Sequence, residues 1–248
     1  RRQRQMCIRD RNDKTTPVPK PEPEILTRFK KHTAAHEMEV ILDQGMHRHL
    51  RFARPGTGIY HFHIVTWPGY LAISGDMGAS IFSRLPDMFE FFRTPDHLHA
   101  GAHGLYINRG YWCEKLVAND GAPRRFDERL IEGFLRNDFD AYMEFQDLEE
   151  IPRGQELAAA LWEQIKQDVR GEDVGDVIES AEDFVPDEDE AHGQAFSDFR
   201  FTDMWDSASR LEDYTFDITW RLYAVSHAVR TYDAWKQTQA AAAEVAGA

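Results

Sequence analysis

Two neighbouring segments that are predicted to be strands each carry a pair of histidines at alternate positions, namely His47, His49, His61 and His63. The apolar residues between them, such as Leu50 and Ile64, are expected to face the core, so the histidines share the opposite face. Cross-strand neighbours have β-carbons roughly 4.5–5.5 Å apart, which suits several imidazoles converging on one ion. This pattern predicts a divalent metal site. The alternative is an exposed polar face whose histidines titrate near neutral pH.

A second group of potential ligands follows at residues 96–103 and comprises His97, His99 and His103. A His-x-His pair followed by a third histidine can supply three nitrogen ligands and leave a catalytic position open. The alternative is a surface loop whose histidines are incidental. Asp76, between two glycines, is interpreted as a metal ligand or general base, or as the cap of a hairpin turn; the turn is favoured. The sequence indicates no catalytic residue, and the cofactor that the histidines imply is a divalent metal.

The elements that would position these residues follow from hydrophobic periodicity. Alternating patterns separated by turn residues predict five strands, at 38–42, 47–52, 59–67, 70–74 and 80–84. Short connections make them an antiparallel meander. Helices are predicted at 25–35, 87–93, 109–118, 127–145, 155–170, 174–184 and about 213–239, with a loop at 94–104. The predicted fold class is therefore α+β, with the meander at 38–84 followed by helices that pack on one face of the sheet.

The last predicted helix is the clearest element, because Ile218, Leu222, Val225, Val229 and Tyr232 form an apolar stripe. Residues 25–238 are predicted to form a single domain. Residues 239–248 form an Ala-rich tail that is expected to fray, and residues 1–24 a tail that ends in a Pro-rich linker. Residues 1–11 resemble translated adapter read-through from assembled metagenomic reads; the competing interpretation is a basic arm.

The composition narrows the classes of function. The chain has 248 residues and a formal net charge of −14, which disfavours direct binding to a nucleic-acid backbone. Between residues 171 and 199 there are 11 acidic side chains and no Lys or Arg, which indicates either a solvated loop or a docking surface for a basic partner. No apolar run reaches the roughly 20 residues that a membrane span needs. With only two cysteines, the chain is expected to be soluble and cytoplasmic.

Several short segments resemble a family of phage and prophage proteins of unknown function. They lie at residues 48–52, 66–69, 75–78, 82–84, 87–93, 107–108, 111–116 and 214–233. The resemblance implies an accessory protein that acts in an infected bacterium, and it implies no particular reaction. The leading hypothesis is a protein that binds a host or phage macromolecule through residues 171–199. The alternative is a metal-dependent hydrolase or nuclease-like enzyme that uses the strand histidines.

Overall fold

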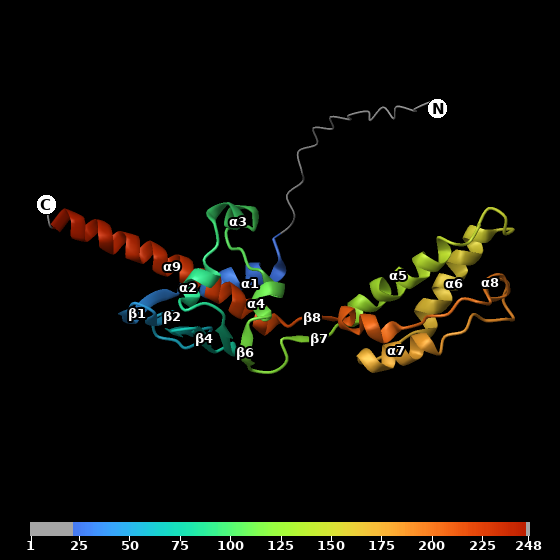
Figure 1. The fold of residues 1–248 in the computed structure, drawn as a ribbon, viewed down its shortest axis with the longest axis horizontal. Helices are drawn as coiled ribbons and strands as arrows, with labels where there is room; N and C mark the ends of the chain where they lie inside the picture. The colour runs from blue at the N-terminus through green and yellow to red at the C-terminus, as the bar shows by residue number, and fades with distance from the viewer. Residues whose placement is uncertain (1–21, 247–248) are drawn as a thin grey trace, which may run out of the picture.

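The structure is a computed structural model that describes residues 22–246. Figure 1 shows an elongated molecule with a sheet at one end, a group of helices at the other and a thin connection between them. We call residues 22–120 together with 215–246 the sheet lobe, and residues 127–211 the helical lobe. Residues 121–126 and 212–214 form the ribbon that joins them. The predictions for residues 1–11 and for the linker up to residue 21 fall outside the described residues.

The sheet lobe is built on one antiparallel sheet with strands in the order β1-β2-β3-β4-β5-β6. The strands are β1 (Glu37–Gln44), β2 (His47–Ala53), β3 (Phe62–Trp67), β4 (Tyr70–Gly75), β5 (Gly78–Ser83) and β6 (Leu116–Asn119). The first five confirm the predicted meander. The sixth was not predicted, because residues 109–118 were expected to be one helix. In the structure that helix, α4 (Arg109–Cys113), ends early and the chain adds a strand beside β5.

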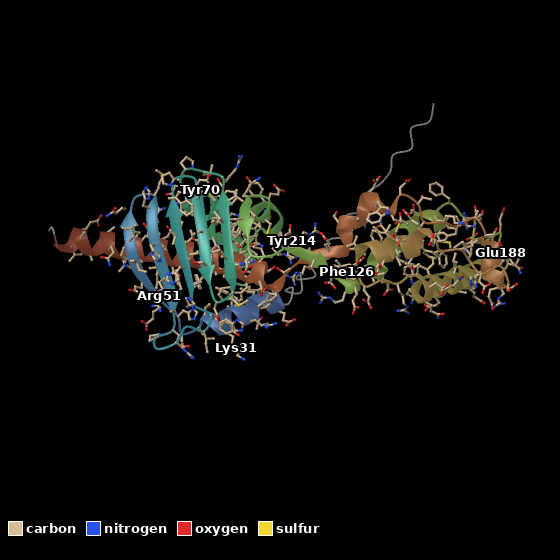
Figure 2. All side chains as sticks on the ribbon, turned by 90° about the horizontal axis from the view of Figure 1, so that it is seen from below. Lys31, Arg51, Tyr70, Phe126, Glu188 and Tyr214 are labelled. Carbon is tan, nitrogen blue, oxygen red and sulfur yellow. The ribbon has the colours of Figure 1, made fainter. Side chains whose placement is uncertain are left out.

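Alternation of burial separates the two faces of this sheet. Leu50 pairs with Ile64 and Phe52 with Phe62, and all four side chains are at most 1% exposed. They face α9 (Phe216–Ala246), whose predicted apolar stripe is buried in the same core. Figure 2 shows the sheet from its other side, where its strands lie in front of α9. The α+β prediction, with a long C-terminal helix across one face, is confirmed.

Two bounds of α9 differ from the prediction. It begins at Phe216 rather than near residue 213, because residues 212–214 pair as a strand of the ribbon. It continues to Ala246, through the Ala-rich stretch that was expected to fray. Although α9 is the longest element, no helix within residues 22–246 offers an apolar stretch sufficient to cross a bilayer.

Short helices complete the sheet lobe on the side of α9, at α1 (Glu24–Thr33), α2 (Met88–Phe92), α3 (Asp96–Gly101) and α4. The prediction of a loop over residues 94–104 was wrong in part, since α3 lies within it. Asp96 favours a helix start there, because an acidic side chain suits the first turn.

The helical lobe contains α5 (Ile131–Met143), α6 (Gly154–Asp168), α7 (Val174–Glu182) and α8 (Ala191–Ala195), with two 3₁₀ segments, η1 (Glu128–Leu130) and η2 (Met204–Leu211). These helices surround a second hydrophobic cluster of their own instead of covering the sheet. The ribbon consists of β7 (Arg124–Phe126) paired with β8 (Glu212–Tyr214). The single domain over residues 25–238 stays a prediction, since the described residues form two separate hydrophobic clusters.

Candidate functional site

The register of β2 against β3 places the strand histidines on the open face of the sheet. Because Leu50 and Ile64 point toward α9, their neighbours His49 and His63 point the other way. Arg51 is paired with His63 on the same face. The half-buried state of these imidazoles reflects contact with neighbouring side chains, since no other element of the described chain covers this face.

His49 and His63 are in direct contact. The Nε2 atom of His49 lies 2.9 Å from the Nδ1 atom of His63, so one nitrogen donates a hydrogen bond to the other. Burial lowers the pKa of His63, and the neighbouring His49, His61 and Arg51 lower it further. His63 therefore favours the neutral form, in which one of its ring nitrogens carries a proton and the other does not.

The other two strand histidines lie apart from this contact to different degrees. His61 immediately precedes β3; its ring centroid is 5.8 Å from that of His63, and its Nδ1 atom is 2.6 Å from the carbonyl oxygen of Gly58. His47 lies at the opposite end of β2, opposite Gln44, and is exposed. The structure thus brings together three of the four predicted ligands. Within residues 22–246, no three His, Cys, Asp or Glu side chains converge closely enough to hold a metal ion.

Asp76 serves the backbone around His61. It lies in the turn between β4 and β5, as the hairpin interpretation predicts. Its Oδ2 atom accepts a hydrogen bond from the Tyr60 backbone N–H at 2.8 Å, and its own N–H donates to the His61 carbonyl at 3.0 Å. Tyr60 has a φ of 57°, which costs energy for a residue with a β-carbon. The Asp76 carboxylate therefore positions the segment from which His61 and His63 extend.

The second histidine group separates in the structure. His99 is 2% exposed; its Nδ1 atom accepts the Tyr106 N–H at 3.0 Å, and its Nε2 atom lies 2.5 Å from the hydroxyl of Thr94. Burial lowers the pKa of His99, which keeps the ring neutral. His97 is exposed on α3, and His103 lies beyond its end with a φ of 53°. His99 thus uses both ring nitrogens to hold the segments at Thr94 and Tyr106 in place.

Histidines on the inner side of the sheet were not predicted as a group. His32 stacks on Tyr60 with centroids 3.6 Å apart and accepts a hydrogen bond from the indole N–H of Trp220 at 3.2 Å. His227 packs edge-on against Phe29 and Phe52. Burial lowers the pKa of His227 to about 4. The helical spacing of His227 from Trp220 is the one sequence signal that indicates its packed position.

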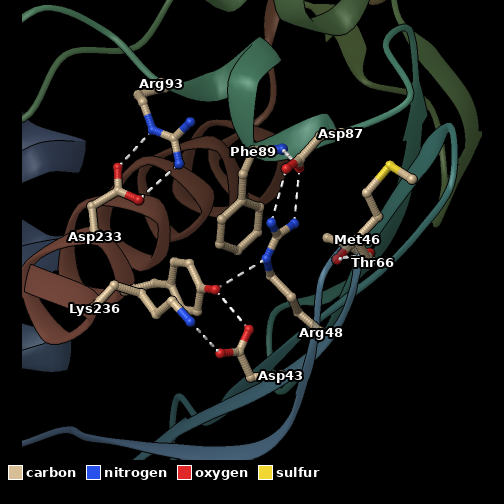
Figure 3. Close-up of polar contacts among 10 residues, drawn as sticks. Asp43, Met46, Arg48, Thr66, Asp87, Phe89, Arg93, Asp233 and Lys236 are labelled. Atoms are coloured by element: carbon tan, nitrogen blue, oxygen red, sulfur yellow. Dashed lines mark hydrogen bonds and ion pairs between the residues drawn. The ribbon is translucent and has the colours of Figure 1, made fainter. Parts of the chain in front are cut away.

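A buried ionic network attaches α9 to the sheet edge (Figure 3). Arg48 is 7% exposed and forms two 2.8 Å hydrogen bonds with Asp87 at the start of α2. Its guanidinium lies 4.6 Å from the centroid of the Phe89 ring. The Arg48 Nε also donates to the hydroxyl of Tyr232 at 3.3 Å, and that hydroxyl donates to Asp43 at 2.7 Å. Each strong donor has an acceptor, so the network is a structural clamp.

The clamp changes how its carboxylate titrates. Burial opposes ionisation of Asp87, but hydrogen bonds from Arg48 and from the Phe89 N–H outweigh it and lower the pKa of Asp87. Arg93 and Asp233 make a second two-point contact nearby, at 2.7 and 2.8 Å. No sequence pattern indicates these pairs, since the partners are far apart along the chain.

Charge is divided very unequally between the lobes. The helical lobe carries 25 acidic and 7 basic side chains, whereas the sheet lobe carries 14 acidic and 13 basic ones. The corresponding formal net charges are −18 and −1. Two aromatic side chains of the helical lobe are also exposed, Phe145 by 87% and Trp205 by 54%. The acidic surface therefore includes apolar contact points.

Comparisons with protein-family models, curated proteins and solved structures found no match to this chain. Its function has to be argued from the geometry and charge described above.

Proposed function

We propose that this chain is a phage-encoded accessory protein that acts by binding a basic host or phage protein through its helical lobe. The observation that carries the proposal is the concentration of charge: −18 on residues 127–211 against −1 on the sheet lobe. A field of one sign accelerates encounter with a partner of opposite sign and excludes partners of like sign.

The surface of the helical lobe offers more than charge. All 11 acidic side chains between residues 171 and 199 lie in a stretch that contains no Lys or Arg to neutralise them. Phe145 and Trp205 are exposed aromatic residues, and aromatic side chains often contribute most of the binding energy at an interface. The charge would guide association and the aromatic side chains would contribute to its lifetime.

The proposal is tested by capture from bacterial lysate with matched charge variants of the full chain. The test variant changes four exposed glutamates of the helical lobe to glutamine: Glu172, Glu179, Glu188 and Glu190. The control makes the same change in the sheet lobe at Glu37, Glu90, Glu114 and Glu244. We expect a basic protein to be retained by the wild type and the control, and lost from the test variant and at high salt. Equal retention by both variants would contradict the proposal.

The contact between His49 and His63 favours a second candidate function, a metal-dependent hydrolase or nuclease-like enzyme. His49 and His63 would supply two ligands of the ion, and bound water would be the nucleophile that such a metal supplies. The test is the metal content of untagged protein by mass spectrometry. Near-stoichiometric metal that is lost in His63→Ala and kept in His47→Ala supports this function. A metal-free wild type whose stability does not change with chelator would contradict it.

A further inference from the structure

A cleft of about 590 Å³ lies in the sheet lobe next to the ribbon. Its walls come from the start of α1, residues 106–110, β8 and the first turns of α9. In Figure 1, α1 and α4 lie on the side of α9 that faces away from the sheet. The volume falls in the range of sites that enclose small ligands, roughly 300–1,000 Å³. No residue of the helical lobe lines the cleft, so the inference does not depend on the proposed function.

The walls combine flat aromatic rings with aliphatic side chains. Tyr106, Tyr214 and Tyr223 line the cleft together with Ile25 and Ile107. Tyr223 is 6% exposed, and burial raises the pKa of its hydroxyl, so it stays a neutral donor. The guanidinium groups of Arg109 and Arg124 already lie 5.4 and 5.5 Å from the centroid of the Tyr214 ring, so the half-buried ring of Tyr106 is the one on which a planar ligand would stack.

One buried hydroxyl of the cleft has no protein partner. Thr219 is 3% exposed, and its Oγ1 atom makes no hydrogen bond with any described residue. Elsewhere on the same helix, Thr231 and Thr238 donate to the carbonyl four residues earlier, at 2.9 and 3.0 Å. Buried hydroxyls are normally satisfied in this or another way. The hydroxyl of Thr219 is therefore a donor in the cleft wall that still has a hydrogen bond to make.

Donors for an anion lie at the same place, although the formal charges of the two charged lining residues, Arg109 and Glu24, cancel. The N-cap of α1 is Pro23, which offers no side-chain cap to the N–H groups of the first turn. Arg109 lines the cleft, and its nearest carboxylate is Asp213 at 3.5 Å. Glu24 also lines the cleft, but its side chain is 85% exposed and pairs with Arg28. Uncapped N–H groups and a guanidinium both bind anions, so these donors indicate an anionic group on the ligand.

We propose that this cleft binds a small aromatic anion, that is, a planar ring that carries a carboxylate or phosphate. The ring lies among the tyrosines, and the anionic group contacts Arg109 and the first turn of α1. Thr219 donates its hydroxyl to an acceptor on the ligand. This assignment accounts for the free hydroxyl, the uncapped helix and the aromatic lining together.

Isothermal titration of the full chain tests the proposal with three probes: a nucleoside 5′-monophosphate, benzoate and inorganic phosphate. We expect one of the two ring-bearing probes to bind with one-to-one stoichiometry and inorganic phosphate to bind much more weakly. The first two probes distinguish a phosphate ligand from a carboxylate ligand. Absence of binding by both ring-bearing probes at about 10 mM overturns the proposal.

Two variants assign the binding to this cleft. Arg109→Gln should weaken the affinity by about tenfold, since it removes a charged hydrogen bond. Thr219→Val should weaken it by about threefold to tenfold without lowering the melting temperature, because the hydroxyl has no partner to lose. Thr231→Val, on the same helix but outside the cleft, is the control and should bind as the wild type does. Unchanged affinity in both cleft variants, or equal weakening in the control, overturns the assignment.

Discussion

The sheet lobe and the helical lobe have similar interiors and different surfaces. Each hydrophobic cluster contains six buried phenylalanines. Ten of the 11 histidines belong to the sheet lobe, whereas the helical lobe carries a formal net charge of −18 against −1 for the sheet lobe. Burial of aromatic side chains explains why each part folds. The differing surfaces indicate that the stability of the sheet lobe depends mainly on pH and that of the helical lobe mainly on salt.

The largest expected effect comes from removing one lobe. Phe126 and Glu212 are paired across the ribbon, so an Asn-Gly turn replacing residues 127–211 should close a hairpin there. We expect calorimetry to show two unfolding transitions for the full chain and one for the shortened chain, at the temperature of the sheet lobe. One cooperative transition in the full chain, with no folded product after shortening, would instead support a single domain over residues 25–238.

Single core substitutions test whether the two lobes lose stability independently. Phe62 is 1% exposed and stacks on Phe52, and Phe199 is equally buried in the helical lobe. Each change to alanine should cost its own lobe about 3–5 kcal/mol of unfolding free energy, because it leaves a cavity. Denaturant unfolding followed by amide hydrogen exchange should locate each loss in one lobe. A loss that spreads equally to the other lobe would show that the two cores are coupled.

The ionic clamp is expected to matter only to the sheet lobe. Arg48→Met leaves the Asp87 carboxylate partly buried without its partner, and should cost about 3 kcal/mol of unfolding free energy. The double variant Arg48→Met/Asp87→Leu should recover part of this loss. Because the folded pKa of Asp87 is lowered, its contribution is present above the ordinary carboxyl pKa and disappears as the pH falls through the folded value. A double variant that is no more stable than the single one would contradict this account.

Mild acid should also distinguish the lobes. The folded pKa of His227 is about 4 and its ordinary value is 6.5, so only the unfolded state takes up the proton between these values. The stability of the sheet lobe should therefore decrease as the pH falls from about 6.5 to about 4, by about 2–3 kcal/mol from this residue. His227→Leu should flatten the dependence in thermal melts. An unchanged slope in that variant would assign the effect to other histidines.

The smallest expected effect is that of salt. Repulsion among the acidic side chains of residues 127–211 is screened by added ions, so 0.5 M NaCl should stabilise the helical lobe by about 1 kcal/mol or less. The sheet lobe, with 14 acidic and 13 basic side chains, should respond less. The measurement is the shift of each calorimetric transition with salt. A larger shift in the sheet-lobe transition would contradict the electrostatic comparison.

The sequence predicts those parts of the structure that repeat over several residues. Alternation around Leu50 and Ile64 is sufficient to predict that β2 pairs with β3 and that His49 and His63 share a face, while it leaves more than one register open. The strand β6 was missed because it is short and lies at an edge, with Val117 58% exposed. A period-two pattern cannot be recognised over so few residues.

Contacts between distant residues were beyond sequence reasoning. Arg48 and Asp87 belong to different elements, and their pairing depends on where α2 packs against α9. His99 resembled a metal ligand in sequence, but the fold directs both of its ring nitrogens to Thr94 and Tyr106. The uncapped α1 and the free hydroxyl of Thr219 became visible only when the elements around them were placed.

The length of α9 has a mechanical consequence. It leaves the ribbon at Thr215, crosses the core of the sheet lobe and continues past the sheet as one helix (Figure 1). Its 31 residues span about 46 Å. The buried first half nucleates the helix, so the exposed end only has to propagate it. A spectroscopic label at Ala240 would consequently lie on a rigid helix whose direction is fixed relative to the sheet. The orientation of the label would therefore report rotation of the whole sheet lobe rather than local motion.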